Sequence, residues 1–227
     1  MRSDAESPDL DVIWSEIDDQ RLRTAAMLDG LTDDQWEHPS LCEGWTVRHV
    51  AAHLTLQRQH LGDVLHLLVE HPRLLRSLGL NRMIHDSAVL QSALPTDEII
   101  ARIRAGIASR RHNSFVTPRE TLTDSIIHAQ DIAIPLGIEL GMRPVAAVIA
   151  AERSWAIRST WLGRVNRHLP IDGYRLAATD AEWSVGSGPE ITGPIGALLL
   201  LITGRLVALD RLEGDGAAQL KMQTQPA

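Results

Sequence analysis

The stretch SLCEGWTVRHVAAHLTLQRQH, residues 40–60, predicts the central helix of the fold. Its polar, turn-rich start changes to a helix at Thr46, whose hydroxyl suits the N-cap position. Apolar residues then recur at three- and four-residue spacing, which predicts an amphipathic helix from Thr46 to about Glu70. The apolar positions are Val47, Val50, Leu54, Leu61, Val64, Leu65 and Leu68. His53 lies next to Leu54, so its imidazole leaves the helix on or beside the face that is expected to be buried.

His53 alone has two interpretations. A buried histidine most often satisfies both ring nitrogens with neighbouring groups, and the other interpretation is metal ligation. The segment TPRETLTDSIIHAQDIAIPLG, residues 117–137, favours the metal. Thr117 is predicted as an N-cap, Pro118 takes the first helical position and Glu120 completes a capping box, so a second helix begins here.

Asp124 and His128 on this second helix are four residues apart, which places both side chains on one face about one turn apart. Two imidazoles and a carboxylate suit a divalent ion such as zinc, and three protein ligands leave a fourth position for water or a substrate. The alternative is that Asp124 and His128 form an ordinary surface pair while His53 is a core residue elsewhere. Asp131, three residues after His128, is either a supporting partner or a rival ligand.

Three phrases of the sequence carry a resemblance to a known family. They are SLCEGWTVRHVAAHL (40–54), DSIIHAQDIAIPLG (124–137) and ITGPIGALLLLITGRLVALDRLEGDG (191–216). Together they resemble the actinobacterial maleylpyruvate isomerase family of mycothiol-dependent enzymes, over residues from about 10 to about 220. The resemblance implies a DinB-like helical bundle that binds a divalent metal, usually zinc.

The residues that match the metal ligands of the family are His53, Asp124 and His128. The family more often has glutamate at the acidic position. Because aspartate is one methylene shorter, either the helices approach more closely here or the carboxylate binds through water. Asp124 is therefore the least secure of the three predicted ligands.

The function implied by the resemblance is chemistry on a mycothiol thiolate. An ion with one open position binds a low-molecular-weight thiol, lowers its pKa and needs no protein cysteine. The thiolate could add reversibly to a conjugated alkene and allow cis–trans isomerisation, or attack an electrophile as a thiol S-transferase. Arg205, in a TGR phrase that matches a family motif, is the candidate catalytic residue because it could bind a carboxylate bidentately. Its alternative role is a helix-end arginine that stabilises its own C-terminus.

The composition of the chain limits which binding partners are expected. The chain has 22 basic and 29 acidic residues, a net charge of −7, and no basic run with interleaved aromatics, so nucleic acid is not expected to bind. The expected partners are a small-molecule thiol and an electrophilic substrate, and the protein is expected to be a monomer or a homodimer. A rival interpretation from another class is a non-catalytic metal-binding scaffold or interaction protein.

The cellular setting is expected to be the cytoplasm, without a membrane. The acidic N-terminus lacks the basic and apolar regions of a secretory signal, and the apolar stretch from Ile195 to Ile202 is too short to span a bilayer. Cys42 is the only cysteine, which excludes an internal disulfide. As a nucleophile it is a weak candidate, because a lone thiol in such a loop is more often simply packed.

The predicted fold class is mainly α, with a helical bundle over residues 1–166 and a small α+β unit over residues 167–227. Helices are expected at 9–29, with Val12 facing inward, at 46–70, after Thr96 as the N-cap, from Thr117 and from Pro144, with a short capped turn at Thr32 to Trp36. Residues 73–94 predict a broken helix or a flexible lid. In the C-terminal unit we expect a β-hairpin from Tyr174 to Val185, a core helix after Gly193 and a final strand around Ala218 to Met222.

Overall fold

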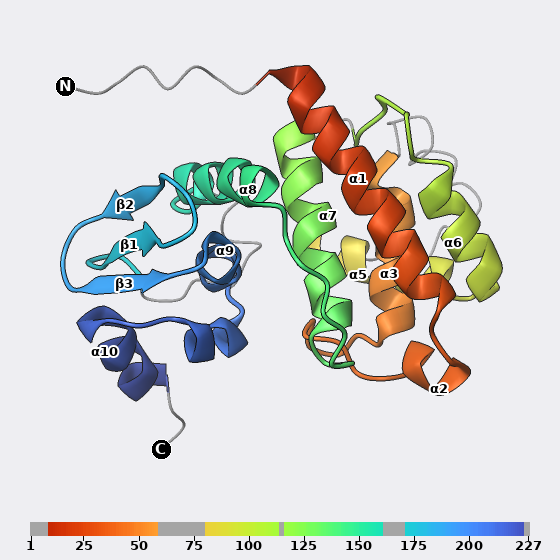
Figure 1. Ribbon diagram of the computed structural model, residues 1–227. Coiled ribbons are helices and arrows are strands. Elements are labelled where there is room, and N and C mark those ends of the chain that lie inside the picture. Colours follow the sequence, from red (N-terminus) through yellow and green to blue (C-terminus); the bar gives the residue numbers. More distant parts are fainter. Residues whose placement is uncertain (1–8, 59–79, 114–115, 161–170, 225–227) are drawn as a thin grey trace. The chain divides into compact units, whose positions relative to one another are not determined.

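The computed structural model describes residues 9–58, 80–113, 116–160 and 171–224. The chain divides into two compact units, Met1–Leu140 and Gly141–Ala227. The described part of the first unit is helical, and the second unit combines three strands with helices (Figure 1). The predicted class, mainly α with a small C-terminal α+β unit, is therefore confirmed.

The first unit is built around α3. Its elements are α1 (Leu10–Asp29), α2 (Asp33–Trp36), α3 (Val47–Thr55), the 3-10 helix η1 (Leu56–Arg58), α5 (Leu80–Gln91), α6 (Thr96–Arg104) and α7 (Pro118–Ala133). Helix α3 lies between α6 and α7 and also contacts α5, while α1 packs along α6 and α7 (Figure 1). Val47, Val50 and Ala51 on α3 are completely buried, so this helix supplies the centre of the core.

Local caps start three of these helices. Thr32 with Gln35, Thr46 with His49, and Thr117 with Glu120 each form a reciprocal capping box. The box at Thr117 was predicted from the sequence. At α6 the prediction was wrong by one residue, because Pro95 occupies the N-cap position and Thr96 is already helical.

Other parts of the prediction for this unit need correction or lie outside the described residues. Val12 was expected to face inward but is 41% exposed, whereas its neighbour Ile13 is buried. The predicted helix around His53 is observed to Arg58, and its continuation to Glu70 falls outside the described residues. In the stretch expected to be a broken helix or lid, residues 80–91 form the continuous helix α5.

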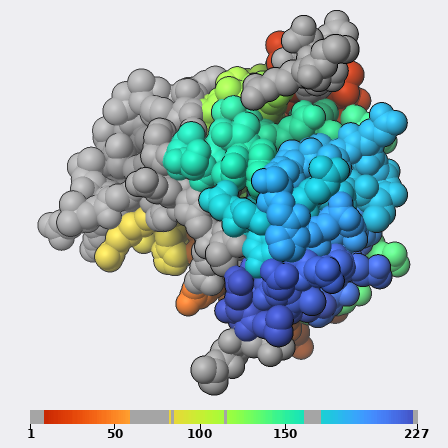
Figure 2. Space-filling view, turned by 90° about the vertical axis from the view of Figure 1, so that its left-hand side faces the viewer, coloured from red at the N-terminus to blue at the C-terminus, as the bar shows by residue number. Residues whose placement is uncertain are grey.

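The second unit is a small mixed sheet with a buried helix. Its elements are α8 (Pro144–Ile157), β1 (Arg175–Ala178), β2 (Ser184–Gly186), β3 (Glu190–Gly193), α9 (Ile195–Ile202), the 3-10 helix η4 (Leu206–Arg211) and α10 (Asp215–Thr224). The strand order is β2-β1-β3, with β1 antiparallel to β2 and parallel to β3. Every residue of α9 is buried, and α9 packs against α8. On the face shown in Figure 2, the dark blue surface of α10 adjoins the lighter blue strands.

One prediction for this half of the chain is wrong, and another stays a prediction. The expected strand at Ala218 to Met222 is part of α10, because Ala217 and Leu220 are buried at helical spacing, and the third strand is β3 instead. Helix α8 was expected to belong to a bundle domain ending at residue 166; it lies in the compact unit Gly141–Ala227, and the predicted domain boundary stays a prediction. Among the described ranges, no helix is both long and apolar enough to cross a membrane.

Two glycines of the second unit allow a matched test of the fold. Both Gly173 and Gly188 have positive φ, but a Cβ at Gly188 would lie 1.9 Å from the carbonyl oxygen of Gly173, whereas a Cβ at Gly173 meets nothing within 4 Å. We expect Gly173→Ala to lower the free energy of unfolding by about 1–2 kcal/mol, the cost of the left-handed conformation. Gly188→Ala is expected to cost clearly more, because backbone must also move. Equal losses in urea unfolding would contradict the described loop geometry.

Candidate metal centre

Helices α3 and α7 bring the three predicted ligands together. The Nε2 atom of His53 lies 3.5 Å from Oδ1 of Asp124, and Nε2 of His128 lies 3.2 Å from the same oxygen. One ligand atom from each residue falls within 4.8 Å of the other two. The two imidazoles meet edge to face, with centroids 4.9 Å apart. The arrangement therefore offers two nitrogens and one oxygen to a single point.

The three candidate metal ligands are partly accessible to solvent. The side chains of His53 and His128 are 15% and 16% exposed, and that of Asp124 is 34% exposed. A small ion can reach the three atoms, while the histidines stay largely shielded from water. Such partial burial suits an open metal site better than a fully enclosed structural one.

Asp131 orients His128 from behind. Its Oδ2 lies 2.9 Å from Nδ1 of His128, and its side chain is completely buried. With Nδ1–H donating to this carboxylate, Nε2 is directed at Asp124, and its lone pair becomes available to a metal when the Nε2 proton is displaced. Metal-binding histidines typically have such a partner. Of the two roles that the sequence left open for Asp131, the geometry favours the supporting partner.

Cys42 also forms a hydrogen bond to the Asp131 carboxylate. Its thiol donates to Oδ2 of Asp131 at 3.1 Å and lies 3.7 Å from Nδ1 of His128. The backbone N–H of Leu41 also donates to the Asp131 carbonyl at 3.1 Å, so the loop before α3 is attached to α7. Cys42, His128 and Asp131 form a second cluster with metal-ligand atoms. Because Asp131 is completely buried while all three residues of the first group are partly exposed, the first group is the better metal site.

Gln57 fixes the other oxygen of Asp124. Its Nε2 donates to Oδ2 at 2.7 Å, and its Oε1 accepts a hydrogen bond from Ser125 at 3.0 Å. This leaves Oδ1 for the imidazoles. Gln57 was not predicted from the sequence, although its position four residues after His53 places it on the same side of the chain.

Trp45 forms the wall beside His53. The two rings are 5.6 Å apart, and Trp45 is also 5.9 Å from the ring of His85 on α5. The Nδ1 atom of His53 is buried and has no hydrogen-bond partner within the ranges that the structure describes. His53 therefore depends on packing for its orientation, whereas His128 is held by Asp131.

Asp124 and His128 are a charged pair before any metal binds. Burial alone lowers the pKa of His128, but the adjacent Asp124 carboxylate outweighs it, and the pKa is raised well above its usual value. Burial alone raises the pKa of Asp124, but His128 and His53 hold it well below its usual value. At neutral pH an imidazolium thus faces an ionised carboxylate, and an incoming cation must displace the proton.

Arg205 lies in the second compact unit, between α9 and η4. Its guanidinium donates to the carbonyl of Thr203, the residue that ends α9. This contact agrees with the alternative role of a helix-end arginine.

Comparisons with known proteins agree with this architecture. Residues 17–113 match the family model described as mycothiol maleylpyruvate isomerase N-terminal domain. A crystal structure of the mycothiol-dependent maleylpyruvate isomerase, in a histidine-to-alanine mutant, is similar with a TM-score of 0.61 at 13% identity, over 92% of this chain and 94% of that one. A second crystal structure of the isomerase gives 0.56 at 12% identity with the same coverage. No curated protein sequence matches the chain significantly.

The contacts rank the residues around Asp124 by their expected effect on metal affinity. Asp124→Asn removes a charged ligand and is expected to weaken zinc binding most. Asp131→Asn and Gln57→Leu remove supporting hydrogen bonds, for which roughly 10- to 100-fold losses are typical. Gln130→Leu is the matched control for Gln57→Leu. Gln130 is also a buried glutamine, but it lies on α7 and donates to the Leu140 carbonyl. A loss for Asp131→Asn larger than for Asp124→Asn, in competition titrations with a chelator, would move the ligand to Asp131.

The raised pKa of His128 predicts a pH dependence. The folded protein without metal keeps its proton on His128 at neutral pH, while Asp124, with a lowered pKa, is already ionised. Zinc must displace that proton, so its apparent affinity is expected to rise with pH and to level off above the raised pKa. Titrations between pH 6 and 9 measure this. An affinity that levels off near the ordinary histidine pKa of about 6.5 would contradict the charged pair.

Proposed function

We propose that this protein is a metal-dependent enzyme that uses mycothiol as its thiol, because residues 17–113 match the family model described as mycothiol maleylpyruvate isomerase N-terminal domain. The observation that carries the proposal is the convergence of His53 Nε2, Asp124 Oδ1 and His128 Nε2. These three atoms support the metal site. Mycothiol as the cosubstrate and the class of reaction are further parts of the proposal.

The donor set fits a divalent ion such as Zn²⁺. Two neutral imidazoles and one carboxylate are common zinc ligands, and they leave a residual charge of about +1 and a free position. When bound, the ion supplies a lowered pKa for a coordinated thiol and holds its thiolate at neutral pH. The charge favours an anionic fourth ligand over water.

The residues of the chain have separate tasks in this proposal. His53, Asp124 and His128 hold the ion, while Asp131 and Gln57 fix two of these three side chains. The only cysteine of the chain already donates its proton to the buried Asp131. An external thiol is therefore a better nucleophile for the site than the protein's own thiol.

Two reactions suit an activated thiolate. Addition of its sulfur to a carbon–carbon double bond conjugated with a carbonyl turns that bond into a single bond, which can rotate. Expulsion of the same thiolate then restores the double bond as the trans isomer, and no atoms are gained or lost. Alternatively the sulfur displaces a leaving group and stays bound to the product, which is S-transfer. Arg205 remains a proposed contact for the substrate carboxylate in either case.

Activity measurements with zinc-loaded protein test the proposal. We expect turnover of maleylpyruvate, or conjugation of the electrophile monochlorobimane, with mycothiol and much less with glutathione or without thiol. His128→Ala is expected to abolish it because a ligand is lost. His38→Ala is the matched control, since His38 is exposed and bonds only locally to the carbonyl of Pro39. Metal binding without mycothiol-dependent turnover of either substrate would leave the rival interpretation, a non-catalytic metal-binding scaffold.

A further inference from the structure

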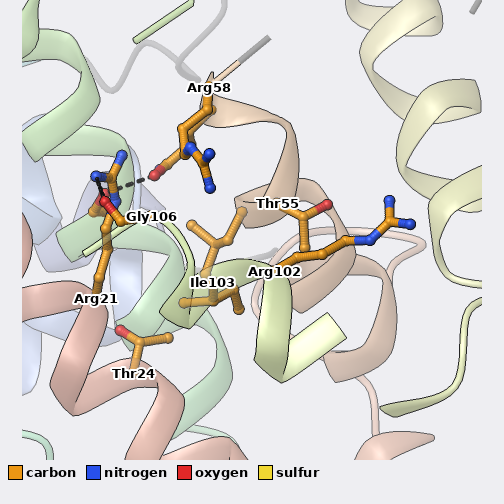
Figure 3. Close-up of a pocket in the computed structure, with 10 residues that line it drawn as sticks. Arg21, Thr24, Thr55, Arg58, Arg102, Ile103 and Gly106 are labelled. Atoms are coloured by element: carbon orange, nitrogen blue, oxygen red, sulfur yellow. Dashed lines mark hydrogen bonds between the residues drawn. The ribbon is translucent and has the colours of Figure 1, made fainter. Parts of the chain in front are cut away.

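A second polar site lies inside the helical bundle. A narrow pocket, partly open to solvent, is lined by residues of α1, α3 with η1, α6 and α7 (Figure 3). Its lining includes three arginines, three hydroxyl side chains and no acidic residue. These polar lining residues are Arg21, Arg58, Arg102, Thr24, Thr55 and Ser125. The pocket is therefore positively charged and rich in hydrogen-bond donors.

Arg21 is the most unusual of these residues, because it is only 5% exposed. Its Nη1 donates to the Gly106 carbonyl at 2.7 Å, but its Nη2 is buried without a hydrogen-bond partner in the described part of the chain. The carboxylate of Asp18 is 3.9 Å away, too far for a hydrogen bond. Burial lowers the pKa of Arg21 to about 10, Asp18 raises it and the nearby Arg58 lowers it. The guanidinium stays charged at neutral pH.

Arg58 adds a second unsatisfied donor. Its Nε is also buried with no partner among the residues described. Figure 3 draws Arg21 and Arg58 on neighbouring sides of the pocket, with Arg102 extending away from them. Arg102 is bound at the surface by Glu98, at 2.7 Å. Arg21 and Arg58 thus have unused N–H groups, and Arg102 is already paired.

Thr24 supplies a neutral donor beside Arg21. Its hydroxyl accepts a hydrogen bond from Gln20 at 3.1 Å, which leaves the hydroxyl proton free to point elsewhere. Thr24 itself is 2% exposed, so this proton is not satisfied by bulk water. Cationic N–H groups beside hydroxyls are the usual donors for a bound oxyanion.

We propose that this pocket binds a small oxyanion, either inorganic phosphate or the carboxylate of a small organic acid. The buried Arg21 and the half-buried Arg58 each have a buried N–H group without a partner in the described ranges, which is costly, and an anion between them satisfies these donors and offsets the repulsion. This site adjoins the metal group through Gln57 and Ser125, and it does not depend on the proposed enzymatic function.

The test is anion binding by the full-length protein without added metal. Phosphate and acetate are titrated in turn at constant ionic strength, with chloride as the balancing anion, and thermal unfolding and calorimetry are recorded. We expect one of the two oxyanions to bind at one site per chain and to raise the unfolding temperature. Phosphate binding with no acetate effect identifies the inorganic oxyanion, and the reverse identifies the carboxylate.

Two variants and one control decide whether the arginines are responsible. Arg58→Gln and Arg21→Gln are each expected to weaken binding at least tenfold. Arg23→Gln removes the same charge from α1, where Arg23 pairs with Asp19 at the surface, and is expected to bind like the unmodified chain. If Arg21→Gln does not fold, Arg58→Gln alone decides. No oxyanion binding, or equal binding by Arg58→Gln and Arg23→Gln, overturns the proposal.

Discussion

The buried carboxylate of Asp131 is the interaction on which the candidate metal centre depends. A completely buried carboxylate requires hydrogen-bond donors, and here His128 and Cys42 supply them. The backbone of Asp131 accepts from Leu41, which fixes the loop that leads into α3. One residue of α7 thus determines the tautomer of His128 and holds the loop that ends at the His53 helix.

A polar path continues from the metal group into the interior of the bundle. Gln57 donates to Asp124 and accepts from Ser125, and both Gln57 and Ser125 line the arginine pocket. The candidate metal group and the proposed anion site therefore share one pair of hydrogen-bonded side chains. A bundle core built only for stability would place apolar residues here, because unpaired polar groups destabilise an interior. The polar path is better explained by ligand binding.

The second unit is organised around an apolar helix rather than a buried carboxylate. Its core helix α9 is buried on all sides, and β1 pairs in parallel with β3 at one edge of the small sheet. Close backbone contacts at Gly188 and Gly214 allow the loops to pass each other. Arg205 sits just after α9 and bonds to its last turn, so it can stabilise the helix end whether or not it also meets a substrate.

Sequence alone determined the features that depend on neighbouring residues. Capping boxes, the 3.6-residue period of α1, α3 and α7, and the β1–β2 hairpin are local, and the spacing of Asp124 and His128 follows from one turn of helix. Only the tertiary structure decided what depends on contacts between distant segments. These are the supporting role of Asp131, the hydrogen bond from Gln57 to Asp124, the parallel strand β3 and the division of the chain before α8. The physical reason is that a side chain's partner is set by packing across elements, which no periodicity encodes.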